Sequence, residues 1–306
     1  MWLREVQESF FDTDNRIHTM THQSRQSRRS FLTTAGVGAA ASLTFVGGRL
    51  TSAPAAETQK DKPKAPFKLA LASYTLRKFD LDATLAMTQR VGLEAICLKS
   101  FHLPLDATPD EIAAAAAKVK EAGIVLYGGG VIGMKNPEQI DQAFEYAKAA
   151  GMVKIVAAPT PDMLSRINEK IQQYDIEVCI HNHGPGDKHF PTPTVAYEKI
   201  KGFDKRFGLC HDVGHTMRYG ECPIEATRKC ADRMLDIHFK DVTEASKAGR
   251  ATPCGRGVID LPALIRTLID INYSGYAAFE YEEHPDDPLP GLAESVGYVR
   301  GVLDTI

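Results

Sequence analysis

Four polar side chains stand where apolar stretches of the sequence end, and their types suit metal chemistry. They are His181 in CIHNHG, Asp212 in LCHDVGH, His238 in IHFKD and Glu280 in AAFEYE. Imidazole and carboxylate groups bind Mn²⁺, Co²⁺, Fe²⁺, Zn²⁺ or Mg²⁺, and the lack of a thiolate in the set argues against a structural zinc site. Any one of these residues alone is more often a satisfied polar group than a ligand. The interpretation therefore depends on whether the fold brings the four together.

The elements that must position them follow a regular order. From Phe67 onward, apolar runs of strand length alternate with helical patterns eight times. Residues that favour helix starts or helix ends punctuate the pattern at Thr108, Asn136, Thr160, Asp260, Gly92, Gly123 and Gly151. The count and the size predict an α/β fold, a (β/α)8 TIM barrel in a single domain over residues 67–306. A doubly wound open sheet is the alternative, but the even repeats and the absence of a Gly-rich dinucleotide turn disfavour it.

In such a barrel the chemistry lies at the carboxyl ends of the strands, and alternation along each strand sorts inward from outward side chains. Cys179 and His181 share one strand face, Gly208 and Asp212 another, Asp236 and His238 a third, and Ala278 and Glu280 a fourth. Small residues thus lie deep in the barrel and polar residues at its mouth. His181, Asp212, His238 and Glu280 are therefore expected to converge from four consecutive strands on one divalent metal ion.

Motifs in the second half of the chain carry a family resemblance. HDVGH (211–215), IHFKD (237–241), GRGVID (255–260) and AAFEYE (277–282) occur in an order and spacing that resemble the xylose isomerase-like TIM-barrel superfamily, in its sugar phosphate isomerase/epimerase and inosose dehydratase branch. The resemblance covers essentially all of 67–306. It implies that Asp212, His238 and Glu280 bind metal and that His215 contacts substrate hydroxyls. It also implies that Lys240, near bound substrate, and Asp241 orient the His238 ligand.

The chain departs from this pattern at the end of the fifth expected strand. Relatives usually read Glu-Asn-His there, and the glutamate is both a metal ligand and one of two catalytic carboxylates; this chain has His181 instead. A histidine that binds metal through one nitrogen cannot also shuttle a proton from that nitrogen. We therefore expect His181 to be the ligand and His183 to act on substrate or protons, although the two could exchange these roles because both face inward.

Other residues could supply the missing acid or base. Lys99, at the mouth of the second expected strand, is a candidate base together with Glu280, and His183 or His102 is a candidate acid. Arg256 is a candidate clamp on substrate oxygens. A surface lysine and a solvated loop arginine are the alternative interpretations of Lys99 and Arg256.

Three functions fit this site. The first is a metal-dependent sugar isomerase or epimerase that acts on a ketose or keto-sugar through a metal-stabilised enediolate. The second is a keto-sugar lyase or dehydratase that acts by β-elimination, for example on a 3-keto-glycoside, with His181 in place of the usual glutamate. The third is a barrel that binds sugar without catalysis. In each case the partner is a small sugar, and homo-oligomers are common among relatives by resemblance.

Composition and charge disfavour other classes. The net charge of −3 over 306 residues shows no dominant basic patch, so no nucleic-acid partner is expected. The superfamily includes DNA repair endonucleases with three zinc ions, but the first, third and fourth expected strands end in SYTL, GGG and AAP, without the extra ligands. Six cysteines without CxxC spacing indicate neither a zinc knuckle nor a disulfide scaffold; Cys97, Cys179 and Cys210 are expected to be small buried residues.

The N-terminal segment predicts export. Arg28 and Arg29 precede an Ala/Gly-rich apolar stretch and an A-x-A site at 53–55, which is the order of a twin-arginine secretory signal rather than a stable membrane span. Met20 is a possible true start, because the segment before it is unusually long and acidic for a signal of this kind. We therefore expect a signal over residues 1–55, a polar lead-in over 56–66, and a periplasmic or otherwise exported location.

Overall fold

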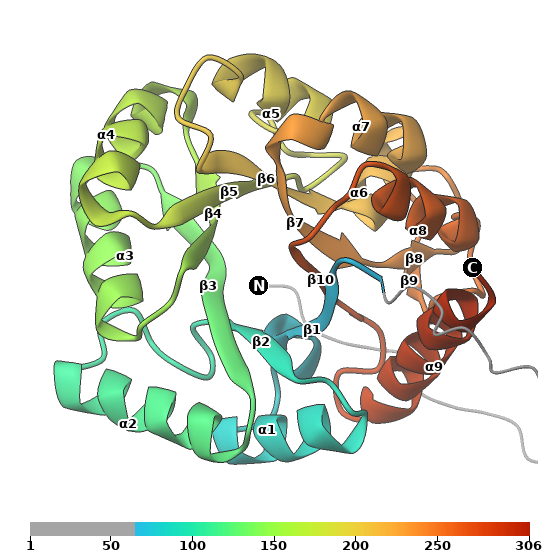
Figure 1. Ribbon diagram of the computed structural model, residues 1–306, viewed down its shortest axis with the longest axis horizontal. Helices are drawn as coiled ribbons and strands as arrows, with labels where there is room; N and C mark the ends of the chain where they lie inside the picture. The colour runs from blue at the N-terminus through green and yellow to red at the C-terminus, as the bar shows by residue number, and fades with distance from the viewer. Residues whose placement is uncertain (1–64) are drawn as a thin grey trace, which may run out of the picture. The chain divides into compact units, whose positions relative to one another are not determined.

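The computed structural model describes residues 65–306, which form a closed barrel of eight parallel strands surrounded by helices (Figure 1). The strands follow one another around the barrel in chain order, so that the first pairs with both the second and the last. The barrel strands are β1 (Lys68–Ala72), β2 (Ala95–Leu98), β3 (Val125–Met134), β4 (Lys154–Pro159), β5 (Glu177–His181), β6 (Phe207–Asp212), β7 (Met234–Phe239) and β10 (Tyr276–Phe279). The predicted TIM barrel is confirmed.

Helices follow the strands and form the outer ring. They are α1 (Leu81–Arg90), α2 (Pro109–Glu121), α3 (Pro137–Ala149), α4 (Leu164–Tyr174), α5 (Pro193–Ile200), α6 (Val213–Tyr219), α7 (Pro223–Lys229), α8 (Leu261–Asp270) and α9 (Leu289–Thr305). Three short 3₁₀ turns, η1 (Ser73–Leu76), η2 (Pro161–Met163) and η3 (Ala231–Arg233), complete the connections. None of the helices within residues 65–306 has the length and apolar character needed to cross a membrane.

The predicted capping residues are confirmed at most helix starts and ends. The side chains of Thr108, Asn136 and Asp260 accept hydrogen bonds from the first turns of α2, α3 and α8. Gly92, Gly123 and Gly151 have φ values of 72°, 69° and 67°, in the left-handed region that ends a helix. Thr160 is the exception: it opens the 3₁₀ turn η2 and makes no capping hydrogen bond, so that α4 begins only at Leu164.

Side-chain alternation divides the barrel residues into two layers. Ile96, Leu98, Ile180, Leu209 and Phe239 belong to the layer that packs against the helices. Small residues and one tyrosine fill the barrel itself: Ala70, Ala72, Ala95, Cys97, Tyr127, Val156, Cys179, Cys210 and Ala278. The three expected cysteines are indeed buried free thiols. Since the interior is packed, the mouth of the barrel is where catalytic residues are expected in this fold.

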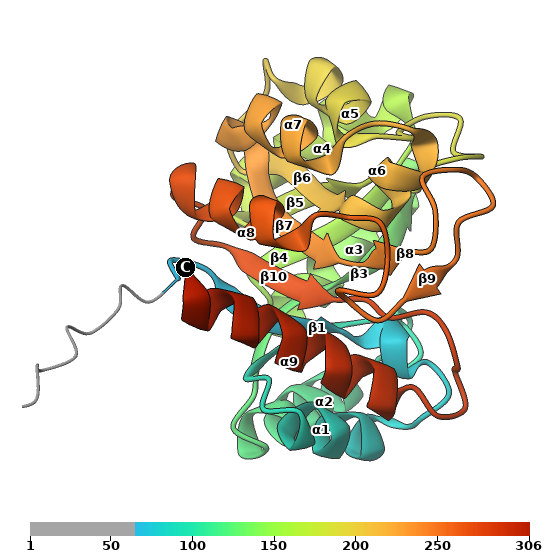
Figure 2. The ribbon, with the colours of Figure 1, turned by 90° about the vertical axis from the view of Figure 1, so that its right-hand side faces the viewer.

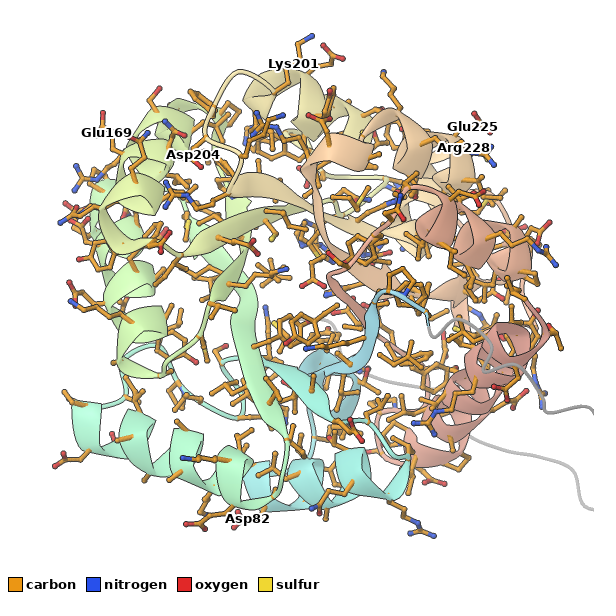
Figure 3. The ribbon with its side chains drawn as sticks, in the orientation of Figure 1. Asp82, Glu169, Lys201, Asp204, Glu225 and Arg228 are labelled. Atoms are coloured by element: carbon orange, nitrogen blue, oxygen red, sulfur yellow. The ribbon has the colours of Figure 1, made fainter. Side chains whose placement is uncertain are left out.

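The carboxyl ends of the strands all lie at one end of the barrel, where the longer loops gather (Figure 2). The loop after β7 contains a small antiparallel hairpin, β8 (Asp241–Val242) and β9 (Ala251–Thr252), which the alternation of the sequence does not predict. Asp82 on α1 and Glu225 on α7 are charged side chains on the outer surface, and Lys201 lies just after α5 (Figure 3). The predicted signal over residues 1–55 and nearly all of the lead-in lie outside the described residues.

Candidate metal centre

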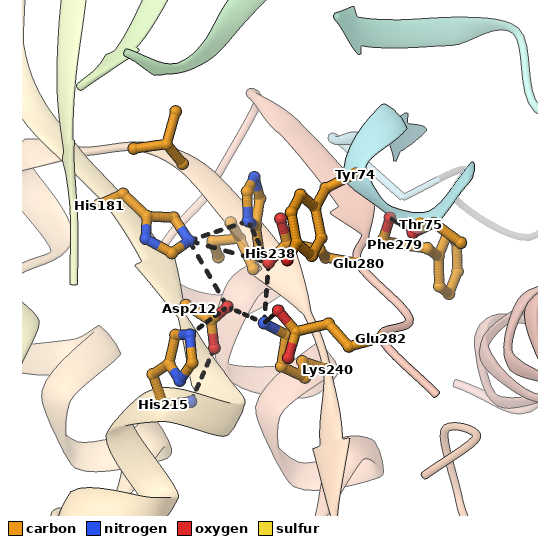
Figure 4. Close-up of polar contacts among 12 residues, drawn as sticks. Tyr74, Thr75, His181, Asp212, His215, His238, Lys240, Phe279, Glu280 and Glu282 are labelled. Atoms are coloured by element: carbon orange, nitrogen blue, oxygen red, sulfur yellow. Dashed lines mark hydrogen bonds and ion pairs between the residues drawn. The ribbon is translucent and has the colours of Figure 1, made fainter. Parts of the chain in front are cut away.

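Four strands place His181, Asp212, His238 and Glu280 within reach of one ion (Figure 4). One ligand atom from each of the four residues lies within 4.8 Å of the other three. His181 is the last residue of β5, Asp212 the last of β6, and Asp212 and His238 are partners in the β6–β7 register. Glu280 directly follows β10. His181 pairs with Cys210 and His238 with Ala278, so the strands bring the four side chains together with a stagger between neighbours.

The donor atoms face one another. His181 Nε2 lies 3.1 Å from His238 Nδ1 and 3.5 Å from Asp212 Oδ2, and His238 Nδ1 lies 3.4 Å from Glu280 Oε2. Atoms that bind one ion at about 2.0–2.2 Å are separated by roughly 3–4.4 Å, so the spacing fits a divalent metal. Asp212 Oδ2 is buried and has no hydrogen-bond partner among the described residues. The donor set thus fits the ion that the sequence predicts.

Asp212 has two roles, one for each of its carboxylate oxygens. Oδ1 accepts a hydrogen bond of 2.7 Å from the backbone N–H of His215 and so caps α6, while Oδ2 faces the other ligands. The sequence suggests that the strand run continues through His215, but the capping hydrogen bond starts a helix at Val213 instead. His215 is consequently carried on α6, with Nε2 4.0 Å from Asp212 Oδ2.

Asn182 explains why the two histidines of the HNH triplet flank an asparagine. Its side chain donates to the carbonyl oxygen of Asp212 and accepts a 3.0 Å hydrogen bond from the backbone N–H of Asp212. It also donates to Thr216 Oγ1 at 3.0 Å. The outward-facing Asn182 therefore locks the end of β5 to the end of β6, and this fixes the height of His181 relative to Asp212.

Lys240 lies against the carboxylates rather than against the His238 ring, which differs from the role implied by the resemblance. Its ammonium donates to Glu280 Oε2 at 2.8 Å and lies 2.9 Å from Asp212 Oδ2, without hydrogen-bond geometry, and 3.1 Å from Glu282 Oε1. The side chain is only 2% exposed. Because it touches both carboxylate ligands, Lys240 can hold them in place and share their negative charge.

These contacts set the charge states of the carboxylates and the lysine. Burial disfavours ionisation, but the charges of His215 and Lys240 hold the pKa of Asp212 well below its usual range. Burial also opposes ionisation of Glu280, where Lys240 and His238 prevail and hold the pKa well below its usual range. Against the effect of burial, Asp212, Glu280 and Glu282 raise the pKa of Lys240 well above its ordinary value.

The imidazoles respond differently to the same surroundings. Burial lowers the pKa of His181 well below its ordinary value, so the ring is neutral and available as a ligand. Burial also lowers the pKa of His215, to about 4. For His238 the effect of burial is outweighed by the charge of Glu280, which raises the pKa. A proton on His238 therefore competes with a metal ion for the same nitrogen.

Cys210 is a further potential ligand that lies deeper in the barrel. Its sulfur groups with donor atoms of His181 and His238 within the same 4.8 Å limit. Burial, followed by the charge of Asp236, raises the pKa of the Cys210 thiol well above its ordinary value. A thiol held in its protonated form is a poor ligand, so the two carboxylates complete the set better.

Other predicted site residues lie around the mouth. His183 is 38% exposed, its ring centroid is 4.5 Å from that of His181, and its Nδ1 lies 3.4 Å from Asp187 Oδ2. Lys99 donates a 2.6 Å hydrogen bond to the carbonyl oxygen of Val131, and burial lowers its pKa. Both side chains are partly exposed, and their catalytic roles stay predictions.

Two predicted residues are engaged elsewhere. The buried His102 ring lies 2.9 Å from Ser73 Oγ and 3.2 Å from the carbonyl oxygen of Leu76, so both of its nitrogens have protein partners. Arg256 pairs with Glu294 on the surface, and its side chain is 66% exposed. Neither contacts the four candidate ligands, and the roles predicted for them as acid and as clamp stay predictions.

Asp241 organises a loop instead of orienting His238. Its carboxylate accepts hydrogen bonds from four backbone N–H groups, those of Val242, Gly255, Gly257 and Ile259. A Cβ atom on Gly257 would lie 2.1 Å from Asp241 Oδ1, so only glycine fits there. The KD and GRG motifs are therefore two halves of one structural contact, which shapes the loop between β7 and α8.

The most important residue that the sequence did not single out is Glu282. It lies two residues beyond Glu280 on the same strand face, and this alternation was the available signal. Nothing in the sequence indicates that the carboxylate of Glu282 lies beside the ammonium of Lys240.

Comparisons with known proteins find relatives of this chain among curated proteins and solved structures. Curated inosose dehydratases match part of the chain: that of Clostridium tetani is 28% identical over 164 residues (45% of this chain, 51% of that protein), and that of Klebsiella pneumoniae 30% over 147 residues (41% and 48%). The chain thus spans about half the length of these relatives in the matched region. Among solved structures, an uncharacterized protein from Parabacteroides distasonis is 25% identical, with TM-score 0.62 and coverage of 78% and 99%.

Two further structures show the same fold at lower identity. The IOLI protein with a bound zinc atom is 18% identical, with TM-score 0.63 and coverage of 78% and 99%, and an L-ribulose 3-epimerase is 16% identical, with TM-score 0.65 and coverage of 78% and 95%. The family model described as xylose isomerase-like TIM barrel matches residues 85–302, most of the described chain. The protein therefore belongs to the xylose isomerase-like TIM-barrel family.

Proposed function

We propose that the protein is a divalent-metal-dependent enzyme that removes a proton beside the carbonyl group of a keto-sugar or keto-cyclitol and then eliminates a β-substituent. The observation that carries this proposal is the ligand set itself, in which two buried imidazoles and two buried carboxylates surround one point. The curated relatives named inosose dehydratase support the same reaction class.

His181, Asp212, His238 and Glu280 would hold the ion. When bound, a divalent cation supplies a Lewis acid that polarises a carbonyl oxygen and stabilises negative charge that develops on it. Lys240 keeps the carboxylates of Asp212 and Glu280 ionised and fixed, so the site needs no rearrangement as charge develops.

Proton transfer falls to residues outside the four ligands. We assign the base to Lys99, because burial lowers its pKa and so increases the fraction of free amine near neutral pH. We assign the acid at the leaving oxygen to His183, whose exposed ring lies beside His181. Histidine in place of a glutamate at position 181 leaves one carboxylate fewer among the ligands, which favours elimination over the exchange of a proton between two carboxylates.

A second candidate, an isomerase or epimerase, is favoured by one observation. Glu282 brings a further carboxylate to the mouth, where its side chain is 32% exposed and so accessible to substrate. Together with Glu280 it could restore the two-carboxylate arrangement that His181 removes.

The test is to incubate the Mn²⁺-loaded protein in deuterated water with ketoses, inososes and 3-keto-glycosides, and to follow the products by NMR. Loss of the proton beside the carbonyl with release of water or an aglycone supports elimination. Deuterium at that carbon with every hydroxyl retained supports the isomerase or epimerase. Binding of metal and sugar without any exchange would leave only a sugar-binding barrel.

We further propose that residues 1–55 direct the protein out of the cytoplasm by the twin-arginine route, on the basis of Arg28, Arg29 and the A-x-A site at 53–55. Export of a folded chain suits a protein that acquires its metal before transport. Replacement of both arginines by lysine should retain the full-length chain in the cytoplasmic fraction, whereas the natural sequence yields a shortened periplasmic form. Equal distribution of both forms would contradict this proposal.

A further inference from the structure

Glu282 completes an ionic group that lies at the mouth of the barrel but outside the four candidate ligands. Its Oε1 is 3.1 Å from Lys240 Nζ, and the same ammonium lies 2.9 Å from Asp212 Oδ2 and 2.8 Å from Glu280 Oε2 (Figure 4). One buried cation therefore serves three carboxylates, of which only two belong to the ligand set.

The charges of this group match a divalent ion. With the three carboxylates ionised, Lys240 protonated and the imidazoles neutral, two negative charges remain, and one divalent cation cancels them. A buried site that keeps a net charge is costly, since charges are poorly solvated in the protein interior. Without Glu282, whose side chain is 32% exposed at the edge of the buried group, only one negative charge would remain, and a divalent ion would leave the group with a net positive charge.

The third carboxylate also changes what Lys240 can do. If the ammonium faced only Asp212 and Glu280, it would interact with just the two carboxylates that bind the metal. It would then compete with the metal ion for them. Glu282 offers the ammonium a partner that is not a ligand. Lys240 can then brace the ligand carboxylates while part of its charge is neutralised elsewhere.

We propose that Glu282 is a positioning residue of the metal centre, which anchors the Lys240 ammonium and supplies the negative charge that lets Lys240 and a divalent ion occupy the site together. This inference rests on the proposed metal-dependent function, but it concerns metal affinity and not the choice of substrate. It makes Lys240 and Glu282 a coupled pair whose separate replacements have opposite effects.

The experiment is a titration of the metal-free protein with Mn²⁺, in which electron paramagnetic resonance reports the free ion. We expect Glu282→Gln to weaken Mn²⁺ binding by about 10- to 100-fold, the range typical when a residue that supports a metal ligand is lost. Lys240→Met should strengthen binding, because the repulsion between the ammonium and the metal ion outweighs the support that Lys240 gives to the two ligand carboxylates. The double variant K240M/E282Q restores the net charge of the group and should bind within about threefold of the natural protein.

Glu283→Gln is the matched control, because it removes the same charge one residue away, where no contact with Lys240 is found within residues 65–306. It should leave the affinity within about twofold. Thermal unfolding of each metal-free variant checks that it is folded. If Lys240→Met does not fold, Lys240→Gln takes its place, and the comparison of E282Q with E283Q decides by itself.

Equal Mn²⁺ affinity of E282Q and E283Q would overturn the inference while leaving the metal centre intact. The same holds if the double variant binds as weakly as E282Q, since the pair would then not be coupled. Failure of the natural protein to bind Mn²⁺, Zn²⁺ or Co²⁺ would overturn the proposed function itself, and the inference with it. The two failures are therefore distinguishable.

Discussion

Within residues 65–306 two lysines are buried, one at each end of the barrel, and their partners differ. Lys154, at the start of β4, donates to the carbonyl oxygen of Leu235, lies 3.3 Å from Glu177 Oε2, and stands 5.9 Å from the centre of the Tyr276 ring. Lys240, just beyond β7, faces three carboxylates within 3.1 Å. Each side chain is at most 4% exposed.

The difference lies in charge balance. At the lower end a single cation meets one nearby carboxylate and a carbonyl group, and the inward Asp236 accepts a hydrogen bond from Tyr127 while burial raises its pKa. At the mouth, three carboxylates surround one ammonium, so negative charge exceeds positive charge. Asp212 Oδ2 also lacks a hydrogen-bond partner among the described residues. We call the group around Lys154 balanced and the group at the mouth unbalanced; the donor atoms spaced for a metal ion belong to the unbalanced group. Four predictions test this distinction, in order of decreasing effect.

Asp212→Asn should have the largest effect, because it removes charge from the unbalanced group. The asparagine oxygen can still cap α6, so the fold should persist. Mn²⁺ affinity should fall at least about a hundredfold and turnover at least about a thousandfold, since a metal Lewis acid contributes several kcal/mol to the transition state. Mn²⁺ titration and kinetics measure the two losses, with circular dichroism as the folding control. Retained metal binding would contradict the assignment of this ligand.

His211 tests a balanced group on the same strand as Asp212 but on its outer face. Its ring nitrogens lie 3.1 Å from Thr227 Oγ1 and 2.9 Å from Thr216 Oγ1, and burial lowers its pKa from 6.5 to about 4. The unfolded chain therefore binds more protons between these pH values. The stability is complete above pH 6.5 and should fall by about 3 kcal/mol as the pH approaches 4.

Urea unfolding from pH 7.5 to 4.5, compared between the natural protein and His211→Gln, isolates this contribution from those of other groups. The variant should show a shallower loss of unfolding free energy with falling pH. Parallel curves for the two proteins would show that His211 is not held neutral by burial.

Lys154→Met is the counterpart at the lower end of the barrel. We expect it to lower the free energy of unfolding by about 1–2 kcal/mol, because Glu177 is 36% exposed and can regain water when its partner is lost. Mn²⁺ affinity should stay within about threefold of the natural value. Chemical denaturation measures the first quantity and Mn²⁺ titration the second. A marked change in metal affinity would erase the contrast between the two ends of the barrel.

Arg256→Ala should have the smallest effect, in line with the second of the two interpretations that the sequence leaves open, a substrate clamp or a solvated loop arginine. Its pair with Glu294 is exposed, and such pairs contribute little to stability because solvent screens the charges. We expect unchanged stability and a KM within about twofold once a substrate is known. A KM raised tenfold or more with kcat unchanged would instead support the clamp, and would mean that the loop closes over bound substrate.

The sequence predicts much of this site because its signals are local. Alternation along each strand decides which face a side chain takes, and polar residues at four successive strand ends can meet only at the mouth of a barrel. The convergence of His181, Asp212, His238 and Glu280 follows from these two facts. The buried cysteines of the barrel follow from the same alternation.

Contacts between residues far apart in sequence decided the rest. Alternation fixes the direction of a side chain but not the reach of a long one, so the sequence could not show that Lys240 would contact Asp212 and Glu282. Loop shape depends on long-range hydrogen bonds, such as those of Asp241 with the segment 255–259, which also leave Arg256 on the surface. The partners of His102 could not be read from the sequence for the same reason, because Ser73 and Leu76 belong to a turn after another strand. Strand periodicity thus determines where the four ligands lie. Tertiary packing determines which charged side chains come to lie beside them.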